Sequence, residues 1–276
     1  MAALSESRIS RRFAELKSRG ECALVTYLTA GFPAPDHTAE LLEALVRGGA
    51  DIIELGVPFS DPIADGPTIQ KASSEALGAG TTVHRILDMV REFRKRHDTP
   101  LVLFGAYNPF FHYGMEGFLR DAAEAGADGI LIPDLPLEEG DEVAPLAKAA
   151  GLDIIFLVAP TTPIERKRAI CARSTGFVYY ISVKGVTGKR TAAHFQLEKP
   201  IAELRQVTDL PVAVGFGISE PAQAAEVAQL ADGVVVGSGI VDLVSRHRDD
   251  PALASLVSDY CRSLKDTTRT RGSKSA

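Results

Sequence analysis

Cysteine is scarce in this sequence. The three cysteines, Cys22, Cys171 and Cys261, lie far apart and form no CxxC pair. An odd number of widely spaced cysteines argues against a disulfide framework and is typical of a reducing compartment. We therefore expect a cytoplasmic protein whose fold is not held by disulfides.

Long apolar runs and a strong excess of one charge are also missing. The first residues, MAALSESRISRRF, contain no continuous apolar stretch, so they predict neither a signal peptide nor a membrane anchor. The net charge is −6 with both signs interspersed, which offers no broad attraction for nucleic acid or an anionic membrane. We expect partners of neither kind.

Several catalytic motifs are absent as well. The six histidines show no HxH or HExxH spacing, so a metal site has little support. No GxGxxG follows the first predicted strand and no GxSxG occurs, which disfavours nicotinamide binding and serine hydrolysis. No strand carries an evident lysine for Schiff-base chemistry, although Lys184 follows one closely.

The sequence does contain a repeated alternation of apolar runs and helical patterns. Its 276 residues, 45% hydrophobic and 24% charged, fit one folded α/β barrel in length and composition. Each run is nearly continuous in apolar character, as in parallel strands covered on both faces. Eight runs predict strands at Ala23 to Leu28, Asp51 to Val57, Leu101 to Ala106, Gly129 to Pro133, Asp153 to Ala159, Phe177 to Ser182, Pro211 to Gly215 and Gly233 to Val236.

Eight strand–helix units predict a single (β/α)8 TIM barrel over residues 1–265. Apolar spacing before Gly20 adds an N-terminal helix that would close the lower end of the barrel. The last segment, KDTTRTRGSKSA, is polar and small, so we expect residues 266–276 to form a flexible tail. The connections 58–67 and 183–195 are longer than usual, and long loops at this end of a barrel carry function.

Two carboxylates mark the second strand and the loop after it, in DIIELGVPFSDPIADGPTIQ. Alternation turns Glu54 away from the side of Ile53 and Leu55, and an inward carboxylate would be desolvated, with a raised pKa suited to proton transfer. Asp65 lies on a flexible segment that could close over a substrate. Alternatively, Glu54 is a satisfied polar residue of the barrel core, and Asp65 forms a turn or caps a helix.

Glycine-rich segments follow the last two predicted strands, VGFGIS at 214–219 and VVVGSGIV at 234–241. Glycine permits close backbone approach, and a helix N-terminus favours negative charge, so these segments predict a phosphate cradle. Its expected contributors are Gly217, Gly237 and Ser238. In KGVTGKRT, at 184–191, Thr187 could donate a further hydrogen bond.

In these motifs the chain resembles the tryptophan synthase alpha subunit family from the first strand through Ile240. The segment 54–70, ELGVPFSDPIADGPTIQ, is similar to the family's defining stretch, and further motifs follow in the family's order. They are YNP at 107–109, PDLP at 133–136, GVTG at 185–188, GFGIS at 215–219 and GSGIV at 237–241. Ala106 departs from members that carry an aromatic residue near the substrate.

The resemblance implies a carbon–carbon lyase that cleaves indole-3-glycerol phosphate to indole and glyceraldehyde 3-phosphate, without a cofactor or metal in this subunit. Glu54 then matches the family's acid/base and Asp65 the carboxylate that stabilises the protonated indole. The resemblance also assigns substrate binding to Tyr27, Ile69, Tyr179 and Thr187, and phosphate binding to Gly188, Gly217, Gly237 and Ser238.

A partner is implied by the same resemblance, namely a beta subunit that carries pyridoxal phosphate, in an alpha2beta2 heterotetramer. The turn 60–62 and the YNP segment are expected to face it, and the loop after the sixth strand to act as a lid. Two alternatives stay open: a phosphosugar isomerase or ring-closing synthase on the same barrel, and a non-catalytic barrel that serves as a binding subunit.

Overall fold

A computed structural model describes residues 7–182, 190–215 and 217–269 of the chain. Within them, parallel strands form one sheet in the order β5-β4-β3-β2-β1-β9-β8-β7-β6. The strands are β1 (Ala23–Thr29), β2 (Ile52–Gly56), β3 (Leu101–Phe104), β4 (Gly129–Leu131), β5 (Asp153–Ile155), β6 (Leu157–Val158), β7 (Val178–Ile181), β8 (Val212–Gly215) and β9 (Gly233–Val236).

The two ends of this sheet are halves of one stretch of chain. β5 pairs with β4 and β6 pairs with β7, and only Phe156 separates them. The predicted strand 153–159 is therefore a single crossing interrupted at Phe156, whose carbonyl still accepts a hydrogen bond from the Tyr179 N–H at 3.2 Å. Chain continuity closes the sheet, and the predicted eight-stranded barrel is confirmed.

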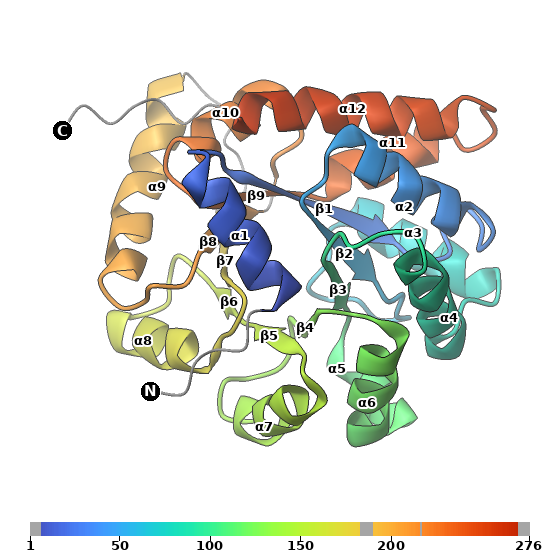
Figure 1. The fold of residues 1–276 in the computed structure, drawn as a ribbon, viewed down its shortest axis with the longest axis horizontal. Helices are drawn as coiled ribbons and strands as arrows, with labels where there is room; N and C mark the ends of the chain where they lie inside the picture. Colours follow the sequence, from blue (N-terminus) through green and yellow to red (C-terminus); the bar gives the residue numbers. More distant parts are fainter. Residues whose placement is uncertain (1–6, 183–189, 216, 270–276) are drawn as a thin grey trace.

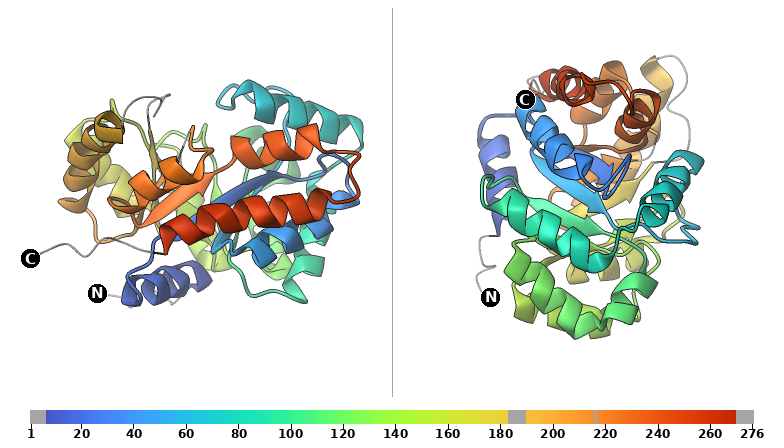
Figure 2. Two further views of the ribbon diagram at one scale, coloured as in Figure 1. Left: turned by 90° about the horizontal axis from the view of Figure 1, so that it is seen from above. Right: turned by 90° about the vertical axis from the view of Figure 1, so that its right-hand side faces the viewer.

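Helices alternate with the strands and surround them (Figure 1). They begin with the extra helix α1 and end with the long helix α12, which packs against α2, α10 and α11 (Figure 2). None in the described part is long and apolar enough to cross a membrane. The helices are α1 (Arg8–Ser18), α2 (His37–Gly48), α3 (Pro67–Gly78), α4 (Val83–Arg94), α5 (Tyr107–Tyr113), α6 (Met115–Ala125), α7 (Gly140–Ala150), α8 (Ile164–Arg173), α9 (Arg190–Arg205), α10 (Pro221–Ala228), α11 (Ser238–Arg246) and α12 (Leu253–Thr268).

Two apolar clusters divide the core by the side of the barrel wall they occupy. The larger lies between the strands and the surrounding helices and contains Ile53 and Leu55. The smaller fills the interior and contains Ile52, together with Ile9, Phe13 and Leu16 of α1. The predicted N-terminal helix thus exists, and its apolar face covers one end of the barrel interior.

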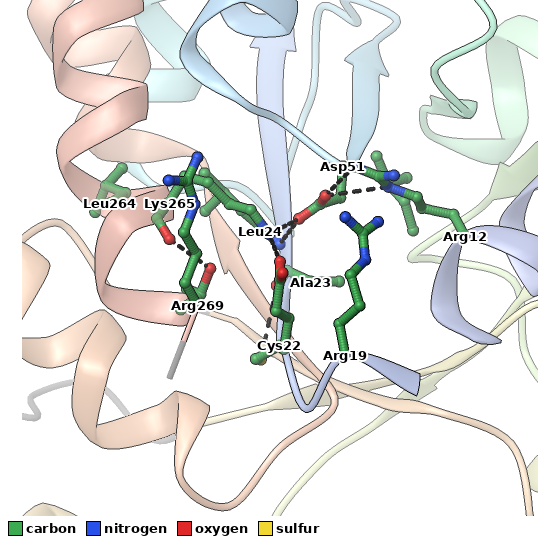
Figure 3. A network of polar contacts seen from close by, with 12 residues as sticks. Arg12, Arg19, Cys22, Ala23, Leu24, Asp51, Leu264, Lys265 and Arg269 are labelled. Atoms are coloured by element: carbon green, nitrogen blue, oxygen red, sulfur yellow. Dashed lines mark hydrogen bonds and ion pairs between the residues drawn. The ribbon is translucent and has the colours of Figure 1, made fainter. Parts of the chain in front are cut away.

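A buried carboxylate, Asp51, links several elements at the N-terminal end of the barrel. Asp51 has no exposed side-chain surface, and it accepts hydrogen bonds from the Leu24 N–H at 2.7 Å and the Lys265 ammonium at 2.8 Å. The Arg12 guanidinium donates to it at 2.6 Å. Figure 3 shows Arg12 and Lys265 approaching Asp51 from α1 and α12. A charge is tolerated in this apolar setting because each of its oxygens has a donor.

Helix α12 runs past the boundary expected at residue 265, and its last described turns are not a frayed tail. Its buried positions recur at helical spacing as far as Thr268, and Lys265 is 6% exposed in its side chain. The polar composition of this segment did not indicate a buried helix. The Lys265 ammonium is buried against the carboxylates of Asp51 and Glu21, which are distant in the sequence, so no local pattern predicts the contact. Residues 270–276 lie outside the described part.

Helix α9 likewise begins earlier than the sequence predicted. It starts at Arg190, inside the segment 183–195 that was expected to be a loop. Arginine and the pair Ala192 and Ala193 favour helix, which accounts for the earlier start.

Replacing Lys265 with methionine, which keeps the bulk of the side chain and removes its charge, tests the role of this contact. We expect the free energy of unfolding in urea to fall by about 2 to 4 kcal/mol, because Asp51 stays buried with one cation fewer. The exposed Lys148→Met on α7 is the matched control. Equal stability of Lys265→Met and the unsubstituted chain would contradict a structural role for α12's last turns.

Candidate active site

The carboxyl ends of several strands surround a cavity of about 290 Å³ opposite the end covered by α1. Side chains reach it from β1, β2, β3, β7 and β9, and the loops before α3, α10 and α11 complete its wall. Most residues predicted from the sequence lie here together, namely Tyr27, Glu54, Asp65, Ile69, Tyr179, Gly217, Gly237 and Ser238. Thr187 and Gly188 lie outside the described residues.

Glu54 is the floor of the cavity and is 1% exposed. The alternation of β2 places it on the same side as Ile52 of the barrel interior, and opposite Ile53 and Leu55. Its Oε1 has no hydrogen-bond partner among the described residues, and burial raises the pKa of its carboxyl to about 8. Near neutral pH Glu54 therefore holds a proton that it can donate.

Asp65 enters the cavity from the loop between β2 and α3. The loop is folded on itself, since the Asp65 N–H donates to the Pro62 carbonyl at 3.0 Å and the Gln70 amide donates to the carbonyls of Pro62 and Asp65. Helix α3 takes Gly66 as its N-cap without a side-chain cap, so Asp65 does not serve as the cap. Burial raises the pKa of its carboxyl to about 6, which leaves it mainly ionised at neutral pH.

Two tyrosines, Tyr27 and Tyr179, line the cavity, and the hydroxyl of each lies over a glycine of a neighbouring strand. A Cβ added at Gly56 would be 2.1 Å from the Tyr27 hydroxyl oxygen, and one added at Gly215 would be 2.1 Å from that of Tyr179. No side chain other than hydrogen fits at either glycine without displacing the tyrosine. Burial, with the charge of Glu54 as a lesser cause, raises the pKa of Tyr179, which therefore stays neutral.

The glycines predicted to cradle a phosphate line the other side of the cavity. Gly217 has a φ of +81°, which favours glycine, and Gly237 precedes the first turn of α11. The first N–H groups of a helix lack acceptors within it and carry partial positive charge. No acidic residue lies in the first turn of α11. An anionic group in the cavity would therefore meet backbone donors.

Some lining residues were not predicted from the sequence. Phe104 and Val235 supply apolar walls, and the Phe104 ring meets that of Tyr27 edge-on with the centroids 5.5 Å apart. The pairing of strands could have identified Phe104. It pairs with Gly56, which is the next inward position of β2 after Glu54. Ala106 is not among the residues of this cavity and lines a smaller space beneath the loop of Asp65.

Within the described residues, no group of three or more histidine, cysteine, aspartate or glutamate side chains is arranged to hold a metal ion. The cavity offers one neutral carboxylic acid, one carboxylate, two neutral phenols and backbone N–H groups. Such a set can transfer a proton to a substrate and stabilise a positive charge next to it.

Comparisons with known proteins identify close relatives. The family model described as "Tryptophan synthase alpha chain" matches residues 13–269. The tryptophan synthase alpha chain of Marinobacter nauticus is 50% identical over 262 residues, which cover 94% of this chain and 97% of that protein. The tryptophan synthase subunit alpha of Legionella pneumophila has a TM-score of 0.88 at 38% identity, over 95% of this chain and 98% of that one. A Mycobacterium tuberculosis tryptophan synthase structure matches with a TM-score of 0.86 and 37% identity, over 96% and 99%.

The raised pKa of Glu54 predicts a pH-dependent stability. Folding raises this pKa from 4.5 to about 8, so the folded chain holds the proton more tightly, and this group's contribution to the free energy of unfolding decreases across that range. Glu54→Gln should therefore gain stability relative to the unsubstituted chain as pH rises from about 4.5 to 8, by a few kcal/mol, measured by urea unfolding. For Asp65→Asn the corresponding gain in stability should stop near pH 6, because the pKa of Asp65 is raised only to about 6. If the difference in free energy of unfolding between Glu54→Gln and the unsubstituted chain did not change with pH, the raised pKa of Glu54 would be contradicted.

Proposed function

The chain belongs to the tryptophan synthase alpha chain family, which cleaves indole-3-glycerol phosphate in tryptophan biosynthesis, and we propose that Glu54 and Asp65 carry out this cleavage. Members of this family are lyases, and the alpha chain itself carries no cofactor. The observation that carries the proposal is that one cavity holds a neutral Glu54, whose Oε1 has no hydrogen-bond partner among the described residues, and an ionised Asp65.

Glu54 acts first as an acid and then as a base. Its carboxyl donates a proton to the indole carbon that bears the glycerol phosphate chain, which makes the ring cationic. The resulting carboxylate removes the proton from the adjacent side-chain hydroxyl, a carbonyl forms there, and the electrons of the broken carbon–carbon bond return to the ring. Glu54 donates one proton and takes up another, so it ends the cycle protonated again. Its burial keeps water from competing for either proton.

Asp65 stabilises the cation that forms between these two steps. Its carboxylate would accept the hydrogen bond of the ring N–H, whose positive charge grows as the carbon is protonated. A negative charge next to a forming positive charge is worth more in this partly dry cavity than in water. Ile69, Phe104 and Val235 are suited to packing against the indole ring, with the two tyrosines beside it.

The phosphate is assigned to the backbone donors at Gly217, Gly237 and Ser238. Helix α11 begins at this point, and a phosphate at a helix N-terminus gains from the free N–H groups and from the helix dipole. Gly188 and Thr187 are expected to complete the site from the loop after β7, which we propose as its lid.

We further propose that the chain works in an alpha2beta2 complex with a beta subunit that holds pyridoxal phosphate, in the cytoplasm. Ile63 is 90% exposed and directly follows the turn 60–62, and Phe111 is 60% exposed and lies two residues after the YNP segment at 107–109. Exposed apolar side chains near these segments are suited to a protein interface. A complex would keep the apolar product from escaping into water.

Substituting the two carboxylates tests the proposed chemistry. Glu54→Gln removes the acid and the base together, and Asp65→Asn removes the charge that stabilises the cation. Each should lower kcat for indole release from indole-3-glycerol phosphate at least about 100-fold. Binding of glycerol 3-phosphate should persist in both, because neither carboxylate is assigned to the phosphate. Substantial indole release by Glu54→Gln would refute the assignment.

Substituting the exposed apolar residues tests the partner surface. Ile63→Ser and Phe111→Ser should each weaken the affinity for a beta subunit about tenfold, because they remove apolar contact at the interface. Titration calorimetry against a purified beta subunit measures this. Ile164→Ser, on α8, is the control for loss of an exposed apolar side chain. If both variants bind as well as the unsubstituted chain, the partner occupies another face.

A further inference from the structure

Tyr260 of α12 reaches the back of the proposed phosphate cradle from outside the barrel. Its hydroxyl donates a hydrogen bond to the carbonyl oxygen of Ser219, 41 residues earlier in the sequence. Ser219 is two residues after Gly217, in the loop between β8 and α10. Burial is the main cause that raises the pKa of Tyr260 to about 12, so the hydroxyl keeps its proton and stays a donor.

The N–H side of the same residue is also fixed. The Gln223 side-chain oxygen accepts hydrogen bonds from the N–H groups of Ser219, at 2.9 Å, and Glu220, at 3.1 Å. Glu220 and Gln223 form a reciprocal capping box at the start of α10. Ser219 is therefore held through its N–H from α10 and through its carbonyl from α12.

The second cradle segment meets the same hydroxyl at Gly239, in the first turn of α11. A Cβ added at Gly239 would be 2.4 Å from the Tyr260 hydroxyl oxygen, and 3.2 Å from the Cβ of Ser219. Glycine at 239 thus lets α11 approach the loop after β8 and the tyrosine at once. One hydroxyl lies where both cradle segments come together.

We propose that Tyr260 is a positioning residue for phosphate recognition, acting by holding the 217–219 loop against the first turn of α11. The inference rests on the proposed function, since it takes these segments as the phosphate site. Backbone donors recognise an anion only when they are fixed in direction, and a flexible loop would lose entropy each time it bound. Tyr260 is not among the residues that line the cavity, so we expect its substitution to change binding of the phosphate and not the chemical step.

Tyr260→Phe, studied in the full chain, separates binding from chemistry. Loss of one hydrogen bond should raise KM for indole-3-glycerol phosphate and Ki for glycerol 3-phosphate together, by about 3- to 10-fold, while kcat stays within about twofold. Tyr113→Phe is the matched control, because its hydroxyl donates to Asp121 at 2.6 Å away from the cradle. An unchanged Ki, or a loss of kcat without a change in Ki, would overturn the inference.

Gly239→Ala gives a second and independent variant if Tyr260→Phe folds poorly. Its added methyl group should displace the tyrosine hydroxyl and raise both KM and Ki. In the Tyr260→Phe background, Gly239→Ala should raise KM and Ki by less than it does in the unsubstituted chain, because the hydroxyl oxygen that clashes with the methyl group is gone. If the effects of Gly239→Ala and Tyr260→Phe on KM and Ki simply add, the proposed coupling between the two residues is wrong. If glycerol 3-phosphate does not compete in the unsubstituted chain, the phosphate assignment itself falls.

Discussion

The buried carboxylate of Asp51 fixes the part of the barrel on which the cavity depends. It precedes β2 and accepts the N–H of Leu24 in β1, so the two strands are aligned where they start. The same register places Tyr27 beside Glu54 in the middle of the paired segment. A shift of one residue between these strands would turn Glu54 out of the cavity, because side chains alternate along a strand. The positions of Tyr27 and Glu54 in the cavity thus depend on a contact at the opposite end of the barrel.

Aspartates at two other strand starts repeat this arrangement. Asp128 accepts the Leu101 N–H at 2.8 Å, and Asp232 accepts the Val212 N–H at 3.0 Å. Asp128 is also paired with guanidinium groups from α1 and α4. The N-terminal end of the barrel therefore holds paired charges that serve stability, whereas Glu54 and Asp65, which we propose for the chemistry, line the cavity at the carboxyl end.

Local patterns in the sequence sufficed for the barrel and for the inward direction of Glu54. Strand alternation and the spacing of apolar residues act over a few residues, and the position of Glu54 between Ile53 and Leu55 follows from them. Lys265 was assigned to the edge of a tail because its partner, Asp51, is 214 residues away. Phe104 was missed for a similar reason, since its place depends on which strands are neighbours. Family membership, rather than any single motif, excludes the isomerase, synthase and non-catalytic alternatives.

The raised pKa of Glu54 also bears on how the proposed substrate would enter the cavity. A phosphate monoester carries close to two negative charges at neutral pH, and a cavity with two ionised carboxylates would repel it. With the pKa of Glu54 near 8 and that of Asp65 near 6, the empty cavity presents one negative charge around pH 7. A protonated Glu54 thus lowers the electrostatic barrier to entry, so that the group we propose as the acid would also ease the entry of the anion.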